Sequence, residues 1–103
     1  VEGELGRIVG FENHAGRTRL GPSQAPFARV VRGHGNDGRS GFEGARRANV
    51  IGTYIHGPLL PKNAALCDWL VATALGLPPG GLAPLDDSLE QAAHANALAA
   101  AGV

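Results

Sequence analysis

Glycine and proline interrupt this chain so often that only short strands and helices can form in most of it. Of its 103 residues, 16 are glycine and 7 are proline. They do not build a low-complexity tract, because they separate short apolar runs in the way that turn residues do. The sequence therefore predicts one small domain, or part of a larger one, in which short elements are joined by tight turns.

Three apolar runs in the first part of the chain are predicted to be strands. They are Arg7–Phe11, Phe27–Arg32 and Asn49–Ile55, each rich in β-forming residues and bounded by turn residues. The third run is almost continuously apolar, as a strand covered on both faces would be. The polar, glycine-rich segment from Gly33 to Arg47 is predicted to be a loop.

Two helices are predicted in the second part of the chain. The first begins after Asn63, a favoured N-cap residue, and ends near Gly76; its apolar face repeats at helical spacing through Leu66, Leu70, Ala74 and Leu77. The second is expected from Leu89 to Ala101, after a capping box formed by Ser88 and Gln91. Strands followed by a strand–helix unit are typical of one edge of an α/β sheet. No linker divides the chain, so residues 1–103 are expected to belong to a single domain.

The charge balance argues against several classes of partner. Nine basic and nine acidic residues leave no net charge, so no field draws the chain to nucleic acid or to an anionic membrane. No apolar stretch is long enough for a transmembrane segment, and the first residues do not resemble a signal peptide. A single cysteine cannot form an internal disulfide, which favours a reducing, cytoplasmic environment.

Three other features are interpreted as structural. Gly33–Gly38 matches a dinucleotide-binding pattern, but no helical sequence follows that could hold a pyrophosphate, so a polar turn is the better interpretation. The four histidines have no cysteine at zinc spacing, so no metal site is predicted. Cys67 lies within the first predicted helix and is expected to fill space in a core rather than to react.

His56 is the best candidate for a catalytic side chain. It follows the third apolar run and precedes Gly57 and Pro58, which permit a sharp turn and stop the strand. Enzymes with α/β folds place their chemistry at such strand ends, where an imidazole can accept a proton from a thiol. The residues alone leave one alternative open, a hydrogen-bonded structural histidine.

Two separated motifs, Gly10–Thr18 and Gly52–Gly57, add a more specific indication. They resemble the G-[FY]-E-x-H-x-G-x-T stretch and the G-T-Y-[IL]-H-G motif of cobyric acid synthase-type glutamine amidotransferases, a branch of class I. Gly57–Asn63 and the segment Gly33–Gly44 are most similar to the glutaminase subunits of lipid II isoglutaminyl synthases. The resemblance covers roughly Arg7 to Leu77.

This resemblance implies the C-terminal part of a three-layer α/β class I glutamine amidotransferase domain, with His56 as the catalytic base. In such glutaminases a cysteine attacks the side-chain amide of glutamine, and the ammonia passes to a partner. The partner implied here is a Mur ligase-like synthetase that amidates D-glutamate of lipid II to D-isoglutamine in peptidoglycan synthesis. ATP and Mg²⁺ are expected on that partner, within a heterodimer, and no cofactor is expected on this chain.

The same resemblance places the cysteine nucleophile and the oxyanion hole upstream of the first motif, and the 103 residues do not supply them. Many class I enzymes also carry His-x-Glu, whereas here Pro58 stands at the position of the acid. The cobyric acid synthase-type branch usually manages with a cysteine–histidine pair, so this departure fits the branch. Two other functions remain open. One is an amidotransferase of corrinoid synthesis, and the other is a non-enzymatic module that binds a ligase partner.

Other polar side chains have two possible roles each. Glu12 and His14 are predicted to bind substrate glutamine if their loop packs beside His56; otherwise that loop is hydrogen-bonded to itself. Glu43 is expected to pair with Arg46 or Arg47, or to be solvated.

Overall fold

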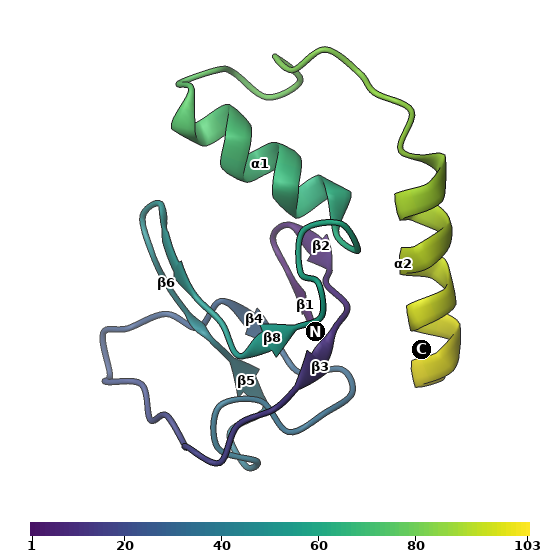
Figure 1. Ribbon diagram of the computed structural model, residues 1–103. Helices are drawn as coiled ribbons and strands as arrows, with labels where there is room; N and C mark the ends of the chain where they lie inside the picture. Colours follow the sequence, from purple (N-terminus) through teal and green to yellow (C-terminus); the bar gives the residue numbers. More distant parts are fainter.

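The computed structural model describes residues 1–103 as a set of short antiparallel strands with two helices (Figure 1). A four-stranded sheet has the order β2-β1-β4-β5, while β3 pairs with β8 and β6 pairs with β7. The strands are β1 (Glu2–Gly3), β2 (Gly6–Arg7), β3 (Phe11–Glu12), β4 (Ala28–Arg29), β5 (Phe42–Glu43), β6 (Ala45–Arg47), β7 (Val50–Gly52) and β8 (Ile55–His56).

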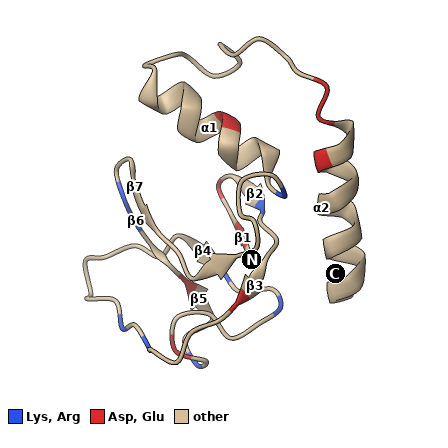
Figure 2. Ribbon diagram, viewed as in Figure 1, with Lys and Arg blue, Asp and Glu red and all other residues tan.

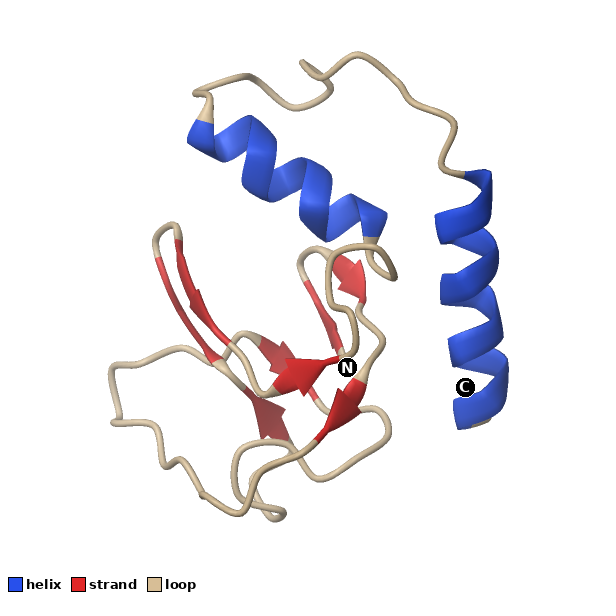
Figure 3. Ribbon diagram, in the orientation of Figure 1, coloured by secondary structure: helices blue, strands red, loops and turns tan.

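The helices are α1 (Ala64–Ala74) and α2 (Ser88–Ala101), joined by a long irregular segment (Figure 3). Both helices were predicted, and α1 follows Asn63 as expected. The prediction of a domain with both strands and helices is confirmed. The predicted three-layer arrangement of the amidotransferase domain is not confirmed. Neither helix is long and apolar enough to cross a membrane.

Two of the predicted strands are divided in the structure. The run 49–55 contributes β7 to a hairpin with β6 and β8 to the pair with β3, so the prediction of one strand was wrong. The division has a physical cause, because the Tyr54 N–H donates to the Glu43 carboxylate and not to a neighbouring strand. The predicted loop 33–47 also contains β5 and β6, so the prediction of a loop over the whole segment was wrong.

The predicted strand 7–11 is divided between β2 and β3, and the side chain of Asn63 replaces a neighbouring strand at the break. Its amide accepts from the Val9 N–H at 2.8 Å and donates to the carbonyls of Val9 and Leu59 at 2.8 and 2.7 Å. Asn63 is 3% exposed. It occupies the N-cap position of α1 but makes no side-chain cap bond there, because its amide is used between segments.

We expect Asn63→Ala to lower the free energy of unfolding by roughly 2–4 kcal/mol, because buried backbone groups of Val9 lose their partners. Asn49→Ala is the matched control, since Asn49 is exposed, and it should change stability by less than about 0.5 kcal/mol. Urea unfolding of the protein expressed from its complete reading frame measures both. Equal effects of the two substitutions would contradict the bridging role.

The core lies where α1 covers the strands. Its buried apolar residues are Ile8, Phe27, Ala28, Ile55 and Leu66. Ile55 is the residue before His56, so the core fixes the backbone of β8 while the next side chain is exposed. Burial of the Ile55 side chain therefore positions the His56 side chain on the opposite face of the strand.

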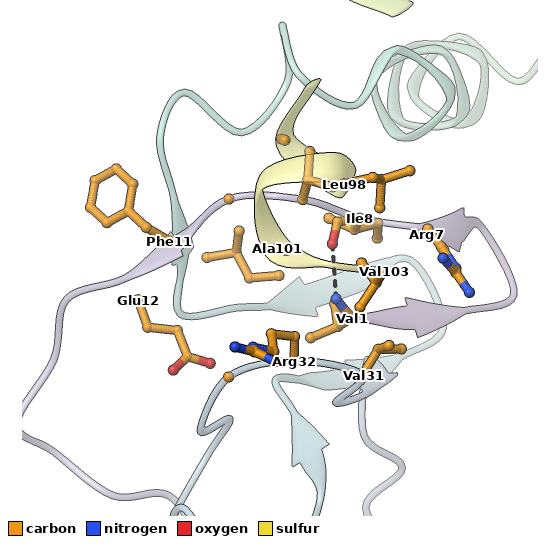
Figure 4. A pocket seen from close by; sticks show the side chains of 15 residues that line it. Val1, Arg7, Ile8, Phe11, Glu12, Val31, Arg32, Leu98, Ala101 and Val103 are labelled. Carbon is orange, nitrogen blue, oxygen red and sulfur yellow. Dashed lines mark hydrogen bonds between the residues drawn. The ribbon is translucent and has the colours of Figure 1, made fainter. Parts of the chain in front are cut away.

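Helix α2 packs more loosely, and none of its residues is buried. The predicted capping box was wrong, because the helix already begins at Ser88, whose N–H donates to the Asp86 carboxylate. The His94 Nδ1–H donates to the Lys62 carbonyl at 2.8 Å and ties α2 to the start of α1. The C-terminal turns of α2 and the strands line a partly open, mostly apolar pocket of about 260 Å³ (Figure 4).

Candidate functional site

The candidate site is built on the antiparallel pair of β3 and β8. Phe11 lies opposite His56, and Glu12 lies opposite Ile55. Residues that lie opposite one another share a face of the ladder, and successive residues alternate between faces. His56 therefore shares an exposed face with Phe11, whose ring stacks on the imidazole at a centroid distance of 5.7 Å. The histidine is the last residue of β8, in agreement with its predicted position at a strand end.

Two glycines allow this close arrangement. A Cβ on Gly10 would overlap Ile55 Cγ2 and the His56 carbonyl oxygen, so a side chain at position 10 would force β3 away from β8. Gly57 has a φ of 109°, which L side chains rarely adopt, and a Cβ there would lie 2.6 Å from the Phe11 ring. The backbone on both sides of His56 thus requires glycine for steric reasons.

We expect Gly10→Ala to lower the free energy of unfolding by about 1–3 kcal/mol, because overpacking moves the strand beside His56. Gly21→Ala is the control, since nothing lies within 4 Å of a Cβ at that position. Thermal unfolding of both variants checks this expectation. A fully stable Gly10→Ala protein would mean that β3 can shift without cost.

Glu12 lies beside β8 but does not face the same side as His56. Its carboxylate accepts from the His34 N–H at 3.0 Å and from the Gly35 N–H at 2.8 Å, and so anchors the turn that follows β4. Figure 4 shows the Phe11 ring and the Glu12 side chain projecting to different sides of the strand. This contact is a structural one, and it joins two loops that are distant in the sequence.

His14 is held by Tyr54, two residues before His56. The two rings stack at a centroid distance of 3.7 Å with an angle of 7° between their planes. The His14 Nδ1–H donates to the Gly16 carbonyl, and the Tyr54 hydroxyl is hydrogen-bonded to the Thr18 hydroxyl at 2.6 Å. The loop after β3 is therefore bonded to itself and also packed beside the segment that leads to His56.

Glu43 is fully buried, so the expectation that it would pair with Arg46 or Arg47 or remain solvated was wrong. Its carboxylate accepts from the Thr53 hydroxyl at 3.0 Å and from the Tyr54 N–H at 2.6 Å. Burial raises the pKa of the Glu43 carboxyl above its ordinary value, although these two donors act in the opposite direction. Arg46 instead pairs with Glu4 and lies over the Trp69 ring.

The structure brings Glu12 and His14 together in a polar cleft of about 270 Å³, and His56 is not among the residues that line it. Arg17 and His34 also line this cleft. Basic and acidic residues are interspersed over the fold (Figure 2). No group of three or more His, Cys, Asp or Glu side chains is placed to hold a metal ion.

Sequence reasoning missed Phe11, Glu43 and Asn63 as residues that organise the site. The sequence signal for Glu43 was weak, because a glutamate beside two arginines is usually solvated. Cys67 lies half-buried on α1, and no hydrogen bond joins its thiol to His56. Cys67 does not belong to the buried cluster, so it does not fill the core in the way that was expected.

Comparison with known proteins gives a family match. The model of the CobB/CobQ-like glutamine amidotransferase domain matches residues 2–64. Subunit GatD of the glutamine-hydrolyzing lipid II isoglutaminyl synthase of Streptococcus pneumoniae is 52% identical over 66 residues, which are 64% of this chain and 25% of that protein. The corresponding Staphylococcus aureus subunit is 45% identical over 70 residues, 68% of this chain and 28% of that protein.

A probable cobyric acid synthase of Methanothermobacter thermautotrophicus is 50% identical over 50 residues, which are 48% of this chain and 10% of that protein. The chain thus spans about a quarter of the length of the two GatD subunits and a tenth of the cobyric acid synthase.

Proposed function

This chain belongs to the CobB/CobQ-like glutamine amidotransferase family, and from that premise we propose that it carries the catalytic histidine of a glutaminase. The observation that supports the proposal most directly is the position of His56. The imidazole is exposed at the end of β8, inside the region that the family match covers. An exposed imidazole on a rigid strand end can exchange protons with a bound substrate.

In the proposed reaction, His56 takes the proton of a cysteine thiol that residues 1–103 do not provide. The thiolate attacks the side-chain carbonyl carbon of glutamine, the C–N bond breaks, and His56 returns the proton to the leaving ammonia. Water then hydrolyses the thioester and releases glutamate. Cys67 has no part in this scheme, because it lies within α1 and its thiol makes no hydrogen bond to His56.

We assign Glu12 and His14 to the neighbourhood of the bound glutamine. The contacts of Glu12 support a positioning role, since its carboxylate is occupied by the backbone of residues 34 and 35. His14 has one ring nitrogen bonded to Gly16 and lines the polar cleft, which supports contact with a polar substrate.

The two GatD subunits support an acceptor in peptidoglycan synthesis. In this proposal the ammonia passes to a Mur ligase-like synthetase that uses ATP and Mg²⁺ to convert D-glutamate of lipid II to D-isoglutamine. The shorter match to a cobyric acid synthase supports the corrinoid alternative less strongly.

The test uses the protein expressed from its complete reading frame, together with the candidate synthetase. Glutamate release from glutamine is measured first, and transfer of ¹⁵N from the glutamine amide is then followed to lipid II and to a cobyrinic acid diamide. Label in lipid II is the expected result. Label in the corrinoid alone would show that the corrinoid, and not lipid II, is the acceptor. Absence of glutamate release would overturn the proposal of a glutaminase.

A further inference from the structure

The imidazole of His56 lacks a hydrogen-bonded orienting group within the chain. The histidine ring nitrogens that make hydrogen bonds belong to His14 and His94. The ion pairs of the chain involve only arginines with Glu2 and Glu4. An exposed imidazole without such a partner samples several staggered rotamers. Proton transfer needs a defined ring position, because small misplacements of a reacting group cost large factors in rate.

The aromatic ring of Phe11 supplies the contact that hydrogen bonds do not. It stacks on the imidazole with an angle of 24° between the two planes. Offset stacking of this kind is favourable enough to enrich one ring orientation by roughly tenfold.

Three backbone features converge on this contact. The register of β3 and β8 sets Phe11 directly opposite His56. Gly10 lets the two strands approach, and Gly57 leaves free the space that the Phe11 ring occupies. Of these features, the missing side chain at Gly57 concerns the ring itself, because a Cβ there would lie 2.6 Å from ring atoms of Phe11.

Phe11 is not explained by packing in the core. Its side chain is 55% exposed, and it does not belong to the buried cluster. A large apolar side chain exposed to that degree gains little from burial, so core packing does not account for the position of its ring on His56.

We propose that Phe11 is a positioning residue, whose ring holds the His56 imidazole in the orientation used for proton transfer. The inference rests on the proposed glutaminase function and adds the group that orients its base. It assigns to an aromatic ring the task that a carboxylate performs in many histidine-dependent enzymes.

The experiment compares Phe11→Leu and Phe11→Tyr in the protein expressed from its complete reading frame. Phe42→Leu is the matched control, because Phe42 is another partly exposed phenylalanine on a short strand. For glutamine hydrolysis, Phe11→Leu should lower kcat about tenfold while KM stays within about twofold. Phe11→Tyr and Phe42→Leu should keep kcat within about twofold, and the melting temperature of Phe11→Leu should stay close to that of the parent.

A second measurement reads the geometry directly. The ring current of Phe11 shifts the carbon-bound imidazole protons of His56, and Phe11→Leu should remove that shift in the NMR spectrum while Phe11→Tyr keeps it. An active parent whose Phe11→Leu variant keeps kcat would overturn the positioning role and leave the glutaminase intact. A parent without glutaminase activity would overturn both.

Discussion

Replacement of His56 by alanine should abolish most glutamine hydrolysis, with kcat lowered by about 10²- to 10⁴-fold. The thiol would lose its proton acceptor, and the leaving ammonia would lose its proton donor. The fold should tolerate the change, because the His56 side chain is exposed and makes no hydrogen bond. The measurement is glutamate release by the protein from its complete reading frame, with the melting temperature recorded alongside.

His94→Gln is the matched control, since His94 lies on α2 and bonds only to the Lys62 carbonyl. Its glutaminase activity should stay within about twofold of the parent. Free ammonium provides a second check, because it bypasses glutamine hydrolysis. Amidation of the acceptor by the His56→Ala protein with its synthetase should recover when ammonium replaces glutamine. Unchanged glutamine hydrolysis after His56→Ala would contradict the role of His56 as the base. A parent that binds the synthetase but does not hydrolyse glutamine would favour a module that binds a partner without catalysis.

Removal of the Glu43 side chain should cause the largest loss of stability among the substitutions considered. Glu43→Ala leaves the Thr53 hydroxyl and the Tyr54 N–H without their acceptor and opens a cavity at a fully buried position. We expect the free energy of unfolding to fall by about 3 kcal/mol or more. Urea unfolding at neutral pH checks this value, with Asp68→Asn on the exposed face of α1 as the control.

Glu43→Gln distinguishes the effect of the carboxylate charge on stability from the effect of its hydrogen bonds. Glutamine keeps an acceptor for the Tyr54 N–H, so the loss at neutral pH should be smaller than for alanine. Burial raises the pKa of Glu43 in the folded chain above its ordinary value of 4.5. The folded state therefore binds the proton more tightly than the unfolded state does.

Proton binding by Glu43 therefore makes its full contribution to the free energy of unfolding below pH 4.5. This contribution is lost as the pH rises through the pKa of Glu43 in the folded chain. The parent should gain stability relative to Glu43→Gln as the pH falls from 7 to 4. Unfolding curves of both proteins across this range test the expectation, and a difference that does not vary with pH would contradict it.

The sequence allowed prediction of those features that depend on local pattern. His56 stands at the end of a strand because Gly57 and Pro58 follow the apolar run and stop it. Helix α1 follows Asn63, and the apolar residues of this helix recur at helical spacing. Both features can be derived from neighbouring residues alone. The family match over residues 2–64 covers most of the expected extent of the resemblance, from Arg7 to Leu77, but ends before α1 is complete.

The remaining features depend on partners that are far away in the sequence. The burial of Glu43 requires the backbone of Tyr54, and the role of Asn63 requires the buried backbone of Val9. The division of the run 49–55 follows from the first of these contacts. No pattern within a single element reveals such pairings, so the predicted strands were too long.

The bridge between Asn63 and Val9 also has a consequence for how the chain folds. It joins residues 54 positions apart, and β3 cannot pair with β8 until most of the intervening chain has been made. Closure of such a long loop costs entropy before the contact forms, so folding rates fall as sequence separation grows. During synthesis on a ribosome, the surroundings of His56 therefore form only after Asn63 has left the exit tunnel. A shorter nascent chain lacks the folded site around His56.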